Sequence, residues 1–212
     1  MMKLKYVRGL ACLLFTTAIL SGCGSKVSLD TTSIYIDKDG TVKSAVYEEF
    51  DTSVYSEEEL KLFIEGEVIA YNKQSVGQEA AYAKDSSSDL AAAIESLEMK
   101  GGDAVLKMDY ASCADYLGFN DEDDSIRQLA AGTVKGAKDS GIDLDQFSLL
   151  SADGTERISG KNLDEDLYIV IAEGKTDIKV DGTIQYATDD VTVNKDLAAI
   201  SSDGTLSCIV FK

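Results

Sequence analysis

The 212-residue chain contains no histidine, no tryptophan and no proline, and acidic residues far outnumber basic ones. Without histidine there can be no Ser-His-Asp triad, no Cys-His dyad and no His-ligated zinc site. The 20 Lys and Arg residues stand against 38 Asp and Glu, which gives a formal net charge of −18. This acidity argues against nucleic acid as a partner, because phosphate binding needs clustered basic side chains. With 44% hydrophobic residues, we expect neither a disordered chain nor an integral membrane bundle.

The amino-terminal residues have the layout of a secretory signal peptide. Lys3, Lys5 and Arg8 precede a mainly apolar run over residues 10–20. This run is about half as long as the ~20 residues that a membrane-spanning helix needs. We therefore interpret residues 1–22 as a signal peptide.

The segment Leu20-Ser21-Gly22-Cys23 follows directly. It resembles the lipobox of bacterial lipoprotein precursors, in which a leucine and two small residues precede a cysteine. The resemblance implies cleavage between Gly22 and Cys23 and a covalent diacylglycerol group on Cys23; we expect no other cofactor. Two acyl chains hold a protein at a membrane, whereas one binds only marginally. The lipid bilayer is therefore an expected partner, and the outer face of the bacterial cytoplasmic membrane is the expected location.

Removal of residues 1–22 leaves 190 of the 212 residues, with 17 basic and 38 acidic side chains and a formal net charge of −21. An anionic bilayer repels such a chain, so the acyl chains have to provide the anchoring. Residues 23–32 show no packing pattern and are expected to form a lipidated flexible tether. Residues 33–212 suffice for one domain with its own core, although a subdomain boundary near residues 121–124 is left open.

The mature part predicts the α+β class, with antiparallel β-hairpins or a sheet and a few packed helices. Alternating or continuous apolar residues predict the strands. Capping serines precede two of the predicted helices. The strands are expected over residues 33–37, 41–50, 97–99, 104–110, 147–150 and 167–172, the last as a central strand. The helices are expected over residues 56–72 with Ser56 as N-cap, from Ser112 through Phe119, and more weakly over 89–95 and 126–138. The first is expected to be amphipathic, and its apolar side is formed by Leu60, Phe63, Ile64, Val68 and Tyr71.

The tripeptide Asp-Gly-Thr occurs four times, beginning at residues 39, 153, 181 and 203. Its spacing is irregular, so it does not indicate a repeat architecture. Asp and Gly tolerate positive φ and Thr favours a strand start, so we interpret each copy as the turn of a β-hairpin. Residues 178–180 are therefore expected to pair with 183–186, and residues 197–200 with the closing strand that ends at Phe211.

Three segments of the mature chain carry a resemblance to other proteins: Ser112–Asn120 after a hairpin, Ile184-Gln185-Tyr186, and Cys208–Lys212. Together they resemble a group of uncharacterised lipoproteins from anaerobic Gram-positive bacteria. The similarity covers most of the mature chain. It rests on strand and helix patterns, and it implies no activity and no functional residues.

Few residues of the mature chain suggest chemistry. Cys113 and Cys208 remain after the signal peptide is removed and Cys23 is acylated, and both a disulfide between them and two separate buried thiols stay open. No segment has the full pattern of a calcium-binding loop, and we expect no metal site. Asp121, Asp123 and Asp124 are weak candidate ligands, and their run is more typical of a solvated acidic loop.

The leading hypothesis is therefore a membrane-anchored, non-catalytic binding or envelope-surface module with an unidentified envelope or extracellular ligand. One alternative is a surface hydrolase that uses Asp and Glu carboxylates or a bound cation. Another is a small solute-binding protein, although 190 residues are short for two α/β lobes. Two buried carboxyl groups with raised pKa in one pocket would favour the hydrolase. A flat surface with an apolar patch would favour a protein-binding module.

Overall fold

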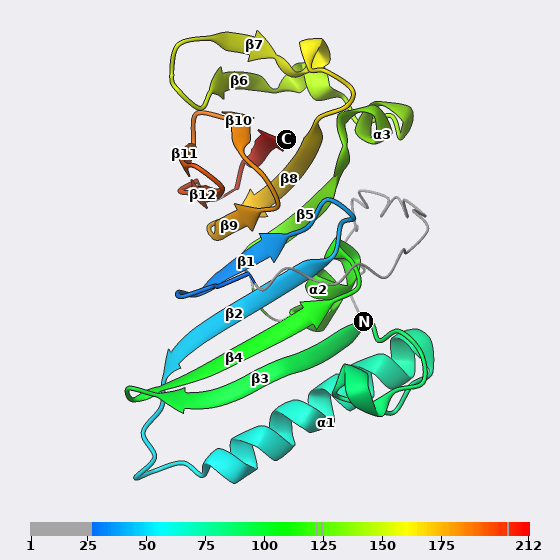
Figure 1. Ribbon diagram of the computed structural model, residues 1–212, viewed down its shortest axis with the longest axis vertical. Helices are drawn as coiled ribbons and strands as arrows, with labels where there is room; N and C mark the ends of the chain where they lie inside the picture. Colours follow the sequence, from blue (N-terminus) through cyan, green and yellow to red (C-terminus); the bar gives the residue numbers. More distant parts are fainter. Residues whose placement is uncertain (1–26, 122, 124, 203) are drawn as a thin grey trace, which may run out of the picture.

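The computed structural model describes residues 27–212 except 122, 124 and 203, and this part of the chain forms two mostly antiparallel β-sheets and three α-helices (Figure 1). It therefore has the predicted α+β class. The predicted signal peptide, including the cleavage residues Gly22 and Cys23, lies outside the described residues. Among residues 27–212 as described, no helix is both long and apolar enough to cross a membrane.

Sheet A has the strand order β11-β12-β9-β1-β2-β4-β3. Its neighbouring strands are antiparallel except β1 and β9, which run parallel. The strands are β1 (Ser33–Ile36), β2 (Val42–Glu49), β3 (Ala92–Lys100), β4 (Asp103–Tyr110), β9 (Asp177–Val180), β11 (Val191–Asn194) and β12 (Leu197–Ile200).

Sheet B is antiparallel throughout, in the order β5-β8-β13-β10-β6-β7. The strands are β5 (Ile126–Thr133), β6 (Ser148–Ser151), β7 (Arg157–Ser159), β8 (Tyr168–Gly174), β10 (Ile184–Ala187) and β13 (Leu206–Phe211). Strand β8 is paired on both sides, which confirms the central strand predicted from its continuous apolar run.

Two of the three α-helices begin where their capping serines predict. Ser56 Oγ accepts the Glu59 backbone N–H at 3.3 Å, and Ser112 Oγ accepts the Asp115 backbone N–H at 3.1 Å. The α-helices are α1 (Glu57–Val76), α2 (Cys113–Phe119) and α3 (Val134–Asp139). Short 3₁₀ turns are η1 (Ala83–Asp85), η2 (Leu144–Gln146) and η3 (Gly160–Asn162).

The largest apolar cluster lies between the two sheets and continues to α1 and α2. It joins Ile36 and Met108 of sheet A to Ile209 and Phe211 of sheet B. A second cluster covers the opposite face of sheet B, where Val134 of α3 meets side chains of β6, β8 and β13. Burial of apolar surface on both faces explains why the strands of sheet B are so apolar.

The segment before β1 lies against the outer face of sheet A. Leu29 is buried in a small cluster with Tyr35 and Ala45. The Tyr47 hydroxyl donates to the Leu29 carbonyl at 2.9 Å, and the Tyr47 backbone N–H donates to Thr32 Oγ1 at 3.0 Å. Residues 27–32, the described part of the expected tether, therefore make specific contacts with the domain.

Two of the four Asp-Gly-Thr copies close the hairpins that the sequence predicts, and two do not. Asp39-Gly40 joins β1 to β2, and Asp153-Gly154 joins β6 to β7. The copy at residue 181 instead connects β9 of sheet A to β10 of sheet B, and the copy at residue 203 connects β12 to β13. The predicted pairings of residues 178–180 with 183–186 and of 197–200 with the last strand are therefore wrong. The chain changes sheets at both positions because each strand finds its partners elsewhere in the sequence.

Two predicted helices are also wrong. Residues 89–95, rich in alanine, lead into β3, where Ala92 pairs with Tyr110 of β4. Residues 126–133 form β5, which pairs with β8 along its length, and only residues 134–139 are helical. In both segments the tertiary pairing overrides a weak local helix propensity.

Candidate docking surface

Asp123, one of the weak candidate ligands in the acidic run, caps a turn. Asp123 accepts the Ser125 backbone N–H at 2.8 Å and the Ser125 hydroxyl at 2.9 Å, and Asp121 is exposed. Asp124 lies outside the described residues. Within the part of the chain that the structure describes, no group of three or more acidic or cysteine side chains is arranged to hold a metal ion.

Cys113 and Cys208 lie on opposite sides of sheet B and are not bonded to each other. Cys113 belongs to the cluster between the sheets, whereas Cys208 belongs to the cluster under α3. The structure thus has two separate buried thiols, one of the two arrangements that the sequence left open. Burial alone raises the pKa of the Cys208 thiol far above its ordinary value, so the reactive thiolate is scarce there.

We expect thiol reagents to modify Cys208 only when the domain opens. The side chain is fully buried, so its labelling in native buffer should be no faster than unfolding, and it should become immediate in denaturant. Counting modified thiols by mass spectrometry checks this, with Cys208→Ala as the control that lacks the site. Rapid native labelling that disappears in Cys208→Ala would contradict the burial of this thiol.

Two hollows in the described part of the chain can be considered as active sites, and both are poor candidates. One, of about 20 Å³, is lined by small and apolar side chains of β5, β8 and α3 and would hold about one water molecule. The other is an open depression of about 470 Å³ beside η2. There Lys161 lies 3.1 Å from Asp145, and the Ser159 hydroxyl also donates to Asp145 at 2.5 Å. These two hydrogen bonds lower the pKa of Asp145, so it is a fixed anion with its partners already present.

A carboxyl group with a raised pKa is found elsewhere, at the end of β1. Burial raises the pKa of Asp37, the Lys38 backbone N–H opposes this shift, and the nearby charges of Asp39 and Asp181 add to the rise. Asp37 lines neither of the two hollows. Neither hollow therefore contains the two buried carboxyl groups with raised pKa that would favour a hydrolase.

The most exposed large apolar side chains of the described residues gather in and around α1. Val54, Tyr55, Leu62 and Phe63 are each more than 60% exposed, and Val76 is 45% exposed. The sequence predicts an amphipathic helix here and assigns Phe63 to its buried side. Phe63 instead points into solvent, at 65% exposure.

Helix α1 is apolar on two opposite sides, and only one of them packs. Ile64, Val68 and Tyr71 face the cluster between the sheets. Val68 follows Gly66 by two residues, a rotation of about 200°, so Gly66 points the other way. Six exposed residues share the direction of Gly66 and form what we call the outer α1 face: Glu59, Leu62, Phe63, Gly66, Ala70 and Lys73. Ile69, at the border of this face, is half-buried and packs against the cluster between the sheets.

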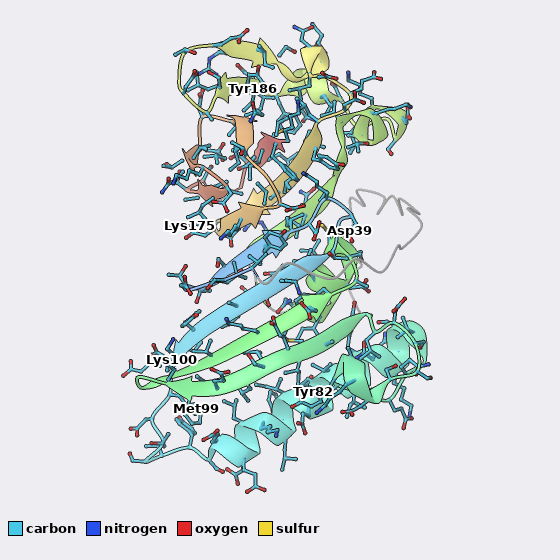
Figure 2. The ribbon with its side chains drawn as sticks, viewed as in Figure 1. Asp39, Tyr82, Met99, Lys100, Lys175 and Tyr186 are labelled. Atoms are coloured by element: carbon cyan, nitrogen blue, oxygen red, sulfur yellow. The ribbon has the colours of Figure 1, made fainter. Side chains whose placement is uncertain are left out.

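Among the described residues, the neighbours of α1 leave this outer face uncovered. Asn72 holds the helix to the edge of sheet A, because its side-chain amide bonds to both backbone groups of Ala92 in β3. The segment after α1 turns back along one side of the helix, where the Tyr82 hydroxyl donates to Glu65 at 2.6 Å (Figure 2). Helix α1 forms the bottom edge of the molecule in Figure 1, below β3. Large apolar side chains exposed in this way are typical of a protein-binding surface.

No signal in the sequence could have separated the outer face from the packed face, since both have apolar residues at helical spacing. Comparisons of this chain with protein-family models, with curated proteins and with solved structures find no match, so the outer α1 face stands on its own geometry as the candidate functional site.

Proposed function

We propose that this protein is an extracytoplasmic lipoprotein whose folded domain is a non-catalytic protein-binding module. A diacylglycerol group on Cys23 anchors it to the outer face of the cytoplasmic membrane. The proposal of an anchor is supported by the basic and apolar segments before Leu20-Ser21-Gly22-Cys23. The proposal of protein binding rests on one observation, the exposed apolar side chains of the outer α1 face.

The short path from Cys23 to the domain supports a close approach to the membrane. Leu29 is buried against sheet A, and the six residues from Cys23 to Leu29 can span at most about 20 Å. An acyl group on Cys23 would therefore keep the face of sheet A that bears Leu29 near the bilayer. The net charge of the mature chain opposes adsorption to anionic lipid, so the anchor itself has to supply the affinity.

The anchor is tested by growing the producing bacterium with a labelled fatty acid. The wild-type chain should incorporate the label and have the mass of residues 23–212 plus acyl groups. Cys23→Ala should incorporate none, because it lacks the thiol that takes the lipid. Cys12→Ala is the matched control, since that cysteine is removed with the signal peptide and its loss should change nothing. Equal labelling of Cys23→Ala and the wild type, or residues 1–22 retained on the native protein, would overturn the proposal.

A further inference from the structure

We propose that the partner of the outer α1 face is a second copy of this chain, bound through an antiparallel contact of the two α1 helices centred on Gly66. This inference rests on the proposed function, because it names the occupant of the same surface. It is argued from the order of side chains along α1, from the position of α1 beside sheet A, and from the area that the contact would cover.

The outer α1 face is complementary to itself when a second helix runs in the opposite direction. With Gly66 against Gly66 of the second copy, residues equally far to either side face each other. Leu62, four residues before the centre, then lies against the small Ala70, four residues after it. Glu59, seven residues before the centre, lies against Lys73, seven residues after it. Large therefore meets small and negative meets positive along the middle of the contact, while the like-charged Glu65 and Glu67 flank Gly66 at its two sides.

Small residues at the centre let the two helices approach closely. Gly66 has nothing within 4 Å of the position where a Cβ would be, so the space above it is open for a neighbouring helix. Phe63 lies one turn from Gly66 and borders this gap on the exposed side. Lys73 already contacts Glu79 at 2.5 Å, but both side chains are about two-thirds exposed, and such pairs exchange partners at little cost.

The position of α1 makes the dimer compatible with one shared membrane. The Asn72 amide bonds to the outward N–H and C=O of Ala92, groups that lie in the plane of sheet A. Helix α1 therefore lies beside β3 at the sheet edge (Figure 1). Because Asn72 faces this edge, the outer face on the other side of the helix is directed away from it. The twofold axis that relates two such helices is normal to the sheet, so both copies present the face that bears Leu29 on the same side. Two anchors at Cys23 would then reach one bilayer.

The area of the contact predicts a weak dimer. Leu62 and Phe63 are the large apolar side chains of the outer α1 face, and if each loses roughly 100 Å² they would bury about 400 Å² of apolar surface over the two copies. This apolar area is smaller than that of a stable interface, so the isolated domain is expected to be monomeric. Anchoring both copies in one membrane raises their effective concentration, and it would convert a weak contact into a populated one.

Cysteine cross-linking in native membranes tests the contact on the full-length chain. Gly66→Cys should give a disulfide-linked dimer on mild oxidation, because its two thiols meet at the centre. Glu59→Cys alone and Lys73→Cys alone should give none, because the two identical positions are about 21 Å apart along an antiparallel pair. Co-expression of Glu59→Cys with Lys73→Cys should restore the cross-link. A cross-link in either single variant would indicate parallel helices and overturn the proposal.

A second substitution separates the contact from the fold. Leu62→Glu places a charge on a side chain that is 61% exposed within one copy, so the melting temperature should be unchanged. In the Gly66→Cys background it should reduce the cross-linked product roughly tenfold, since a buried charge would replace an apolar contact. An unchanged yield of cross-linked product would show that the thiols meet only by random collision.

The alternative outcomes distinguish this proposal from the proposed function. Gly66→Cys can be treated with a membrane-impermeant maleimide in the same membranes. A thiol that is protected from the maleimide but not cross-linked would indicate a different partner, which overturns the dimer and leaves the binding function standing. A thiol that reacts freely and gives no cross-link would overturn both the dimer and the docking surface. Fatty-acid labelling of Cys23 is scored separately and depends on neither result.

Discussion

Replacing Asn72 by Asp is expected to lower the free energy of unfolding by roughly 3 to 5 kcal/mol, although the two side chains have the same shape. Asn72 is fully buried. Its Nδ2 donates to the carbonyl oxygens of Ala80 at 2.8 Å and Ala92 at 2.7 Å, and its Oδ1 accepts the Ala92 backbone N–H at 3.0 Å. A carboxylate cannot donate to the two carbonyl oxygens, and its charge would be buried without a partner.

The penalty should depend on pH in one direction. Burial and the two facing carbonyl oxygens raise the folded-state pKa of the introduced carboxyl above its unfolded value. The protonated form can donate one hydrogen bond, so the variant is least destabilised below the unfolded pKa. It loses stability relative to the wild type as the pH rises through the folded pKa. Urea unfolding of Asn72→Asp and the wild type at several pH values, followed by circular dichroism because tryptophan is absent, measures this difference.

Gln74→Glu is the matched control for Asn72→Asp. It makes the same amide-to-acid change two residues further along α1, at an exposed position. The free energy of unfolding should change by no more than about 0.5 kcal/mol. If Asn72→Asp were as mild as Gln74→Glu, the amide of Asn72 could not be what fastens α1 to the sheet edge.

The role of Asn72 illustrates what the sequence can and cannot predict. Ser56 and the helical spacing after it predict α1 because an N-cap and its helix are neighbours in sequence. The partner of Asn72, by contrast, is Ala92, twenty residues away across a segment without a clear pattern. The asparagine looks like a residue at a helix end, and only the fold shows that it completes the edge of β3. Local signals therefore predict the elements, and long-range pairing decides which polar residues become indispensable.

The outer α1 face is a second feature that periodicity cannot resolve. Phe63 and Val68 both fit a helical apolar stripe, and the sequence assigns both to the core. The structure buries Val68 completely and leaves Phe63 65% exposed. A hydrophobic pattern indicates that a side chain favours burial. It does not indicate whether the side chain is buried by its own chain or by another molecule. Phe63 of the outer α1 face is therefore predicted as a core residue, and the sequence does not indicate the candidate site.

Replacing Gly182 by Ala is expected to lower the free energy of unfolding by about 3 kcal/mol or more. Gly182 is where the chain passes from sheet A to sheet B, at a φ of +156°, a conformation that side-chain-bearing residues rarely adopt. A Cβ there would lie 2.2 Å from the carbonyl oxygen of Lys212. That oxygen accepts the Thr183 backbone N–H at 3.1 Å, so it cannot move away without breaking a hydrogen bond.

Gly154→Ala is the control that separates the sheet crossing from an ordinary turn. It occupies the same place in the tripeptide Asp-Gly-Thr, also has a positive φ of 73°, and has nothing within 4 Å of an added Cβ. Its cost should be only the left-handed strain of about 1 to 2 kcal/mol. Equal losses in Gly182→Ala and Gly154→Ala would mean that the contact with Lys212 is not tight. In a chain that ends at Phe211, the cost of Gly182→Ala should fall toward that of Gly154→Ala, because the carbonyl oxygen of Lys212 is then absent. The same tripeptide at two turns would thus show two different losses in the free energy of unfolding, because different residues of the fold lie next to each glycine.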